Sequence, residues 1–332
     1  MSPNNRVALI EITTNCNLKC THCFANKSSD KVLNLSQIKD ILEKLPSYNV
    51  KDLILYGGEP FLRKDIFEII KYAKNCGIEN IGITTNGLML EEKSIIREIR
   101  KYLDIIVQLV IGVNGASSDT HDFIRGKGQF EHLMRILRSR SVRKLPLGID
   151  ACIGKWNFHE IDEFFNIALS FNGNFFNFVP FVPLGEGKNL MNQVLDPLEC
   201  QQMLEILHEK QIEGEFVDTC IMPYAKVISN DLTGCCNLLT EFITINASGD
   251  LIPCIYLMDY NLGSVLNHDL DALYSNPKAN YFIDLNKFKS ELNGPCKECP
   301  HFELCGGGCK MVSQAIKGSI FESDPLCPFN NQ

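Results

Sequence analysis

The amino-acid sequence predicts an α/β fold built on a parallel sheet. Short runs of β-branched and other apolar residues alternate with amphipathic patterns at helical spacing through residues 1–185, which is typical of βα units. The chain has 332 residues, of which 45% are hydrophobic and 22% charged, close to the average for a globular protein. This composition excludes a disordered, collagen-like or coiled-coil chain, and the length suffices for one large domain or two smaller ones.

Six strands and five helices are expected in alternation, with Ser36, Lys64–Asp65 and Gly77 among the helix start and stop signals. The strands are expected near 7–13, 52–56, 80–84, 105–111, 147–153 and 175–180, and the helices near 36–45, 64–75, 91–101, 129–142 and 158–170.

The alternation ends at residues 184–189, Leu-Gly-Glu-Gly-Lys-Asn, which read as a loop. One more helix is expected near 196–211, before a cysteine-rich tail without regular alternation. We therefore predict a core domain over 1–185, a linker with a helix over 186–215 and a C-terminal domain over 216–332.

Charge and apolar runs limit the functions to consider. A net charge of -8 and a pI near 5.5 leave no basic excess for nucleic acid. The first residues do not form the apolar region of a signal peptide, and no apolar run approaches the ~20 residues that span a bilayer. We expect a cytoplasmic protein with no nucleic-acid or membrane partner. In that reducing compartment, clustered cysteines are more often metal ligands than disulfides.

Three of the fifteen cysteines, Cys16, Cys20 and Cys23, lie in the loop after the first predicted strand. In parallel α/β folds such loops bind cofactors and substrates. Three thiolates can hold three irons of a [4Fe-4S] cluster and leave the fourth iron open. A zinc site that also uses His22 is an alternative with awkward spacing, and thiols without a ligand are a third interpretation.

The C-x3-C-x2-C loop resembles the signature of the radical S-adenosylmethionine (SAM) enzymes. Tyr56-Gly57-Gly58-Glu59-Pro60 after the second strand resembles the G-G-E motif of that family, and Thr84-Thr85-Asn86-Gly87 after the third resembles its T-N-G turn. Arg125 matches the arginine that commonly pairs with the SAM carboxylate. The resemblance implies a partial (β/α)6 TIM-like barrel, whose open iron chelates SAM. The implied SAM contacts are His22, Gly57, Gly58, Glu59, Thr85, Asn86, Asn114 and Arg125, with Glu59 holding the methionine ammonium group.

The tail resembles the SPASM extension, a small cysteine-rich α+β domain with two auxiliary [4Fe-4S] clusters. A zinc ribbon fits this order of cysteines poorly. The fourth ligand of the proximal cluster stays open between Cys220, Cys235 and an iron that binds substrate. Cys76, Cys152 and Cys200 are expected in the core. By position, the distal cluster would use Cys296, Cys299, Cys305 and Cys327, and the proximal cluster Cys236, Cys254 and Cys309.

Several positions depart from the family pattern. His22 replaces an aromatic residue, and Gly112 and Asn114 replace a serine and an aspartate after strand four, so a SAM contact is missing or rebuilt. Ile255 stands where sulfatase-maturing relatives carry a catalytic aspartate, which disfavours formylglycine formation. The residues before Cys16 are too few for the peptide-recognition domain of roughly 80 residues on several relatives, so a separate recognition protein is an expected partner.

The resemblance implies that a low-potential donor of the flavodoxin or ferredoxin type drives reductive cleavage of SAM to a 5′-deoxyadenosyl radical, which abstracts a substrate hydrogen. Three [4Fe-4S] clusters and SAM are the implied cofactors. We expect modification of a ribosomal peptide or protein by a thioether or carbon–carbon crosslink, epimerisation or oxidation. The alternatives are a small-molecule enzyme, such as a tetrapyrrole side-chain decarboxylase or aminoglycoside dehydrogenase, and a non-catalytic electron-transfer protein. The sequence assigns no catalytic residue: Asp218, Cys220 and Glu186 are candidates for closing the reaction by location alone, and a structural or solvated role is the alternative for each.

Overall fold

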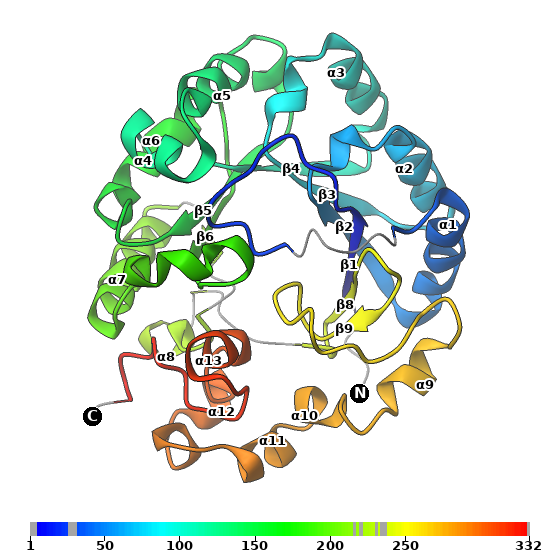
Figure 1. Cartoon of the computed structure of the whole chain (residues 1–332). Helices are drawn as coiled ribbons and strands as arrows, with labels where there is room; N and C mark the ends of the chain where they lie inside the picture. The colour runs from blue at the N-terminus through cyan, green and yellow to red at the C-terminus, as the bar shows by residue number, and fades with distance from the viewer. Residues whose placement is uncertain are drawn as a thin grey trace.

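A computed structural model describes residues 5–25, 32–214, 217–218, 222–229, 232 and 238–330. Within these residues, nine strands form one sheet in the order β7-β6-β5-β4-β3-β2-β1-β8-β9. All neighbours are parallel except β8 and β9, and the sheet curls into a barrel that does not close (Figure 1). The six predicted strands are confirmed as β1 (Arg6–Thr13), β2 (Val50–Gly57), β3 (Asn80–Thr85), β4 (Ile106–Gly112), β5 (Leu147–Ile153) and β6 (Phe176–Pro180).

Helices cover the outer face of this sheet (Figure 1). The first of them begins one residue before the predicted Ser36, because the Asn34 side chain accepts a hydrogen bond from Gln37 N and forms a capping box. The predicted helices are α1 (Leu35–Lys44), α2 (Ile66–Asn75), α3 (Lys93–Ile99), α5 (Gln129–Leu137), α6 (Ile161–Ser170) and α7 (Pro197–Ile212).

The prediction missed one helix of the core, α4 (Ser118–Arg125). It spans eight residues and buries only His121 and Ile124, so few apolar residues mark it in the sequence. A capping box between Ser117 and Thr120 starts it, and Glu160 accepts hydrogen bonds from both hydroxyls. Its last residue is Arg125, so the helix delivers this side chain to the end of β4.

Alternation along the strands separates the core from a central cavity. On β1, Ala8, Ile10 and Ile12 are fully buried, whereas the intervening Leu9 lines the cavity. On β3, Ile81 and Ile83 are likewise buried, and Gly82 lines the cavity. Because side chains alternate across a strand, one set of residues faces the helices and the intervening set faces the cavity.

The tail is more regular than predicted. Strand β8 (Phe242–Ile245) pairs in parallel with β1, with Val7 opposite Phe242, and so extends the sheet of the core. Glu11 at the end of β1 accepts a hydrogen bond from Ala247 N at 3.0 Å. Four residues are too short a strand to recognise by periodicity, and its partner lies far away in sequence. The remaining elements are β7 (Val217–Asp218), α8 (Ala225–Ile228), β9 (Leu251–Ile252), α9 (Leu270–Tyr274), α10 (Asn280–Ile283), α11 (Leu285–Glu291), α12 (Phe302–Cys305) and α13 (Lys310–Lys317).

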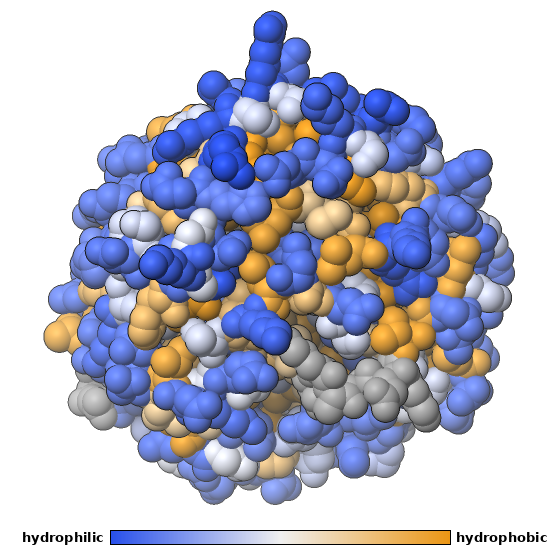
Figure 2. Space-filling model, turned by 45° about the horizontal axis from the view of Figure 1, so that its top comes forward, coloured by the Kyte–Doolittle hydropathy of each residue, from blue (hydrophilic) through white to orange (hydrophobic). Residues whose placement is uncertain are grey.

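Helices α9 to α13 follow the sheet on the side left open by the barrel (Figure 1). The face of the molecule in Figure 2 is mostly hydrophilic, with hydrophobic residues gathered toward its middle. Among the helices of the described residues, none combines the length and the apolar character that a membrane span requires.

Candidate active site

The loop after β1 carries Cys16, Cys20 and Cys23, all three half-buried. Within the described part of the chain, no cysteine forms a disulfide. The turn after β2 lies against this loop, with Gly58 N donating to Thr13 O at 2.8 Å and Glu59 N donating to Asn15 O at 2.7 Å. The three thiols therefore sit at the carboxyl end of the sheet, as predicted.

The two glycines of this turn permit the close approach. A Cβ atom at Gly57 would lie 2.1 Å from Thr13 O, and one at Gly58 would lie 2.3 Å from Asn15 O. Gly57 also has a φ of +147°, which side chains with a Cβ rarely adopt. Neither position can carry a larger residue without separating the turn from the cysteine loop.

Hydrogen bonds from four other segments hold the cysteine loop. They come from the turn after β3, from the end of β4, from α4 and from the segment after β6. The contacts are Asn86 Nδ2 to Asn17 Oδ1 at 2.7 Å, the Asn114 amide to His22 Nε2 at 2.7 Å, Thr21 N to Ile124 O at 3.0 Å and Glu186 N to Cys23 O at 2.9 Å. The structure thus brings together the motifs that the sequence placed after successive strands.

Glu59 joins the turn after β2 to the turn after β3. Its carboxylate accepts hydrogen bonds from Phe61 N at 3.0 Å, from Asn86 N at 2.8 Å and from Thr85 Oγ1 at 2.8 and 2.9 Å. The side chain is fully buried, and this desolvation raises its pKa. A carboxylate has about four acceptor positions, and these three donor groups leave one of them open. Glu59 therefore holds the two turns together, and its contact with the methionine ammonium group stays a prediction.

Asn114, just after β4, forms hydrogen bonds to several segments of the site. With its amide oxygen turned toward the cysteine loop, it accepts hydrogen bonds from His22 Nε2 at 2.7 Å and Arg125 Nε at 3.3 Å. Its backbone oxygen accepts from Trp156 Nε1 at 3.0 Å and Asn157 Nδ2 at 2.9 Å. Asn114 thus links the loop after β1, α4 and the loop after β5. The sequence indicated Asn114, His22 and Arg125 as site residues. It did not indicate Trp156 and Asn157.

Arg125 lies over Gly112, the last residue of β4. A Cβ atom at position 112 would stand 2.0 Å from Arg125 Nη2. The glycine that replaces the expected serine therefore makes room for the guanidinium group. The charge of Arg125 also acts on Glu59 and Asp150, in each case lowering the carboxyl pKa against the larger effect of burial.

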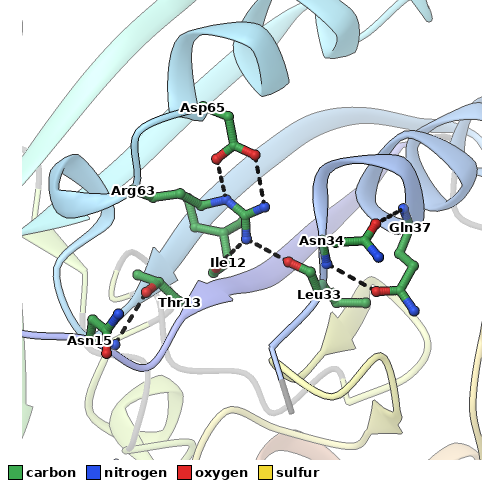
Figure 3. Close-up of polar contacts among 8 residues, drawn as sticks. All are labelled: Ile12, Thr13, Asn15, Leu33, Asn34, Gln37, Arg63 and Asp65. Atoms are coloured by element: carbon green, nitrogen blue, oxygen red, sulfur yellow. Dashed lines mark hydrogen bonds and ion pairs between the residues drawn. The ribbon is translucent and has the colours of Figure 1, made fainter. Parts of the chain in front are cut away.

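Arg63 supports the strand that leads into the cysteine loop (Figure 3). Its Nη1 donates to Ile12 O at 2.5 Å and to Leu33 O at 2.7 Å, and its Nε donates to Asp65 at 2.7 Å. The side chain is only 10% exposed, and its contact holds the pKa of Asp65 below the usual range. Neither residue had been given a functional role from the sequence.

A cavity of about 310 Å³ lies inside the open barrel. Its wall includes residues of the strands together with residues 253–257 and 309–311 of the tail, so both halves of the chain form it. Phe24 of the cysteine loop packs edge-on against Tyr256 of the tail, with ring centroids 4.5 Å apart, and both rings line the cavity. Cys254 and Cys309 are also in the wall.

Four other cysteines of the tail share a second, small cavity: Cys296, Cys299, Cys305 and Cys327. These are the four that the resemblance assigned to one cluster. Cys220, Cys235 and Cys236 lie outside the described residues. Among those described, no three Cys, His, Asp or Glu side chains are arranged to ligate a single metal ion. The thiolates of an iron–sulfur cube each bind a different iron, so they are spread around an inorganic core.

Asp150 and Asn177 form a polar pair in the cavity, and neither residue was predicted from the sequence as part of the site. Asn177 Nδ2 donates to Asp150 Oδ1 at 2.6 Å. The signal that was available is a polar residue within each of two otherwise apolar strands, on the inward-facing positions.

Comparisons with known proteins identify two domains in this chain. The family model of the radical SAM superfamily matches residues 10–168, and that of the SPASM iron–sulfur cluster-binding domain matches residues 235–300. An AdoMet-dependent heme synthase of Methanosarcina barkeri is 26% identical over 97% of this chain and 96% of its own length. The mycofactocin maturase MftC of Mycolicibacterium smegmatis is 26% identical over 96% of this chain and 81% of its own.

Solved structures show the same fold. SuiB of Streptococcus suis, bound to its precursor peptide SuiA, superposes with a TM-score of 0.75 at 20% identity, over 97% of this chain and 76% of the other. The two matched domains imply iron–sulfur clusters and SAM as cofactors. The chain belongs to the radical SAM superfamily, as a radical SAM enzyme with a C-terminal SPASM domain.

Proposed function

We propose that this enzyme modifies a side chain of a peptide or protein, which it binds in the cavity between the barrel and the tail. The observation that carries this proposal is the composition of the cavity wall. The wall contains residues of the strands of the barrel, which end near the cysteine loop. It also contains Cys254 and Cys309 of the tail. A substrate in this cavity would lie between the cysteine loop after β1 and the cysteines of the tail.

We assign the SAM-binding [4Fe-4S] cluster to Cys16, Cys20 and Cys23. The donor set fits, because three thiols on one loop leave one iron for SAM. His22 Nδ1 is buried without a hydrogen-bond partner, and with Nε2 donating to Asn114 it is left as an acceptor that suits an amino group such as that of adenine. When bound, the cluster and SAM would supply the reducing electron and the hydrogen-abstracting radical.

The chain's own residues would orient SAM. Arg125 presents a guanidinium held over Gly112, which suits the SAM carboxylate. Gly57, Gly58, Thr85 and Asn86 shape the turns beside the cysteine loop, and Glu59 holds these turns together. The ammonium group would be bound by backbone oxygens of the turn after β2 and by the remaining acceptor position of Glu59.

We assign two auxiliary [4Fe-4S] clusters to the tail, for three in all. The distal cluster would use Cys296, Cys299, Cys305 and Cys327, and the proximal cluster Cys254, Cys309 and Cys236. Burial raises the pKa of the Cys296 and Cys305 thiols, and a bound iron centre would offset this by favouring the thiolate. We also propose the division into a core over 1–185, a linker over 186–215 and a SPASM domain over 216–332.

Two observations favour a peptide substrate. The cavity volume lies at the lower end of the range for small-molecule pockets, which suits one or two side chains better than a macrocycle. MftC is named as a maturase, and SuiB was solved with a precursor peptide. The partners would be a flavodoxin or ferredoxin as electron donor and a separate peptide-recognition protein.

A tetrapyrrole substrate is the second candidate. It is favoured by the similarity to the heme synthase of Methanosarcina barkeri, which extends over nearly the whole length of both chains. The carboxylates in the cavity wall oppose it, because a tetrapyrrole with propionate side chains brings several negative charges of its own.

The test is release of 5′-deoxyadenosine by the anaerobically reconstituted protein with SAM and dithionite. Reactions would contain no addition, small peptides encoded beside the gene, or iron coproporphyrin. We expect stimulation by one peptide and a mass change in that peptide. Stimulation by the porphyrin alone would overturn the proposal in favour of the second candidate, and cleavage that no peptide stimulates would also count against it.

A further inference from the structure

Four residues form a row across neighbouring strands on the inner wall of the barrel. Gly112 on β4 is in register with Asp150 on β5, Asp150 with Asn177 on β6, and Asn177 with Asp218 on β7. Asp150, Asn177 and Asp218 all line the cavity. The parallel register places the carboxamide of Asn177 between the carboxylates of Asp150 and Asp218. All three lie at the level of Gly112, over which Arg125 lies.

This row presents acceptors to the cavity. The Asn177 amide nitrogen donates to Asp150 Oδ1 at 2.6 Å. The Asn177 oxygen is buried and has no hydrogen-bond partner in the structure. An unpaired buried acceptor costs free energy, so a ligand that brings a hydrogen-bond donor would stabilise this site.

Among the described residues, two cations near the row, Lys310 and Arg125, make other contacts. Lys310 lines the cavity, but its Nζ donates to Gly306 O at 3.3 Å and lies 4.2 Å from the centre of the Phe288 ring. Arg125 bonds to Asn114 and acts on Asp150 at longer range. Burial raises the pKa of Asp150, and a cation bound beside it would offset this desolvation.

We propose that Asp150, Asn177 and Asp218 bind a positively charged group of the substrate, an ammonium or guanidinium such as a lysine or arginine side chain. This inference rests on the proposed function and specifies its substrate class. An ammonium brings three donors and one charge, which matches the two carboxylates and the unpaired amide oxygen. The row thereby fixes a cationic side chain at one end of the cavity.

The same chemistry could come from the ammonium group of SAM, so the experiment separates the two sources. The reconstituted full-length protein, saturated with SAM, would be dialysed against three capped tripeptides, Gly-Lys-Gly, Gly-norleucine-Gly and Gly-Glu-Gly. Norleucine keeps the apolar stem of lysine without its charge. SAM affinity would be measured separately without any tripeptide.

We expect the lysine peptide to bind at least tenfold more tightly than the norleucine peptide, as a charge-assisted hydrogen bond predicts. Asp150→Asn and Asp218→Asn should each weaken lysine-peptide binding about tenfold and leave SAM affinity unchanged. The double variant Asp150→Asn/Asn177→Asp keeps the hydrogen-bonded pair and its charge, and should restore the preference. Asp119→Asn, at an exposed carboxylate on α4, is the matched control.

Equal affinity for the three tripeptides would overturn this inference, as would tighter binding of the glutamate peptide. Loss of SAM affinity in Asp150→Asn without loss of lysine preference would assign the row to SAM. Where a peptide stimulates 5′-deoxyadenosine release and no lysine preference is found, the proposed function stands and the cation site is wrong. Melting temperatures of the variants would show whether each one folds.

Discussion

The guanidinium of Arg125 occupies the space that a side chain at Gly112 would need, since a Cβ there would lie 2.0 Å from Arg125 Nη2. Gly112→Ala should therefore displace Arg125 and weaken SAM binding by about tenfold or more, as loss of a charge-assisted contact predicts. Because the obstructing atom ends a flexible side chain, the melting temperature should change little. Equilibrium binding of SAM checks this. Gly82→Ala is the matched control, because its Cβ would lie 3.7 Å from the nearest atom. Unchanged SAM affinity in Gly112→Ala would contradict the role proposed for Arg125.

Cys16→Ala should abolish SAM cleavage and leave about two thirds of the iron, because each of the three proposed cubes holds four irons. Iron and sulfide analysis of the anaerobically reconstituted variant, together with 5′-deoxyadenosine release, measures both effects. Cys76→Ala is the control, since Cys76 ends α2 and belongs to none of the proposed sites. Loss of all iron in Cys16→Ala would show that the clusters do not assemble independently.

His121 makes the fold sensitive to acid. It is buried with Nδ1 accepting from Asn114 N at 3.2 Å, and desolvation together with the Arg125 charge lowers its pKa to about 3. In the unfolded chain this histidine takes up a proton near its ordinary pKa of 6.5. The stability that neutral His121 contributes to the fold is therefore fully present above pH 6.5 and is lost as the pH falls toward 3. The contribution of His121 to the free energy of unfolding should fall by about 2 kcal/mol between pH 6.5 and 5. His22, whose pKa burial also lowers to about 3, adds to the wild-type slope.

Urea unfolding across this range in wild type and in His121→Asn measures that slope. Asparagine retains an acceptor near the position of Nδ1 and does not titrate. The free energy of unfolding of His121→Asn should therefore fall by about 2 kcal/mol less than that of wild type over this pH range. His159→Asn, at an exposed position, should keep the wild-type slope. Parallel curves for wild type and His121→Asn would show that another group is responsible.

Arg63→Ala should destabilise the protein and disturb the first cluster. The substitution removes two hydrogen bonds to the carbonyl groups of Ile12 and Leu33, and leaves Asp65 without its ion pair. We expect a loss of about 2–4 kcal/mol in the free energy of unfolding. Thermal unfolding and the iron content measure the two effects. Lys64→Ala, at the exposed neighbouring residue, should have neither effect. Normal stability in Arg63→Ala would contradict the supporting role drawn in Figure 3.

The sequence predicted the strands of the core well, because each is a run of apolar residues between clear breaks. It also indicated that the motifs after β1, β2 and β3 would meet, since parallel strands end at the same edge. It missed α4, whose eight residues bury only two side chains, and β8, whose partner lies in another part of the chain. Local patterns do not record such distant pairing.

In the site, too, the sequence predicted what is local and missed what depends on distant contacts. The residue types at Cys16, Gly58 and Arg125 were recognised from motifs, which are local in sequence. Two features depend on contacts between strands: the hydrogen bonds of the Glu59 carboxylate to the turn after β3, and the register of Asp150 with Asn177. These contacts follow only from the three-dimensional arrangement.

The pairing of β1 with β8 bears on synthesis of the protein in the cell. Glu11 and Ala247 are 236 positions apart, so at 5–20 residues per second the ribosome needs roughly ten to fifty seconds to deliver the second after the first. During that interval the nascent chain holds an unpaired strand edge immediately before its first three thiols. A chain that stops before residue 242 would keep this edge permanently, so we expect it to aggregate and to depend on chaperones.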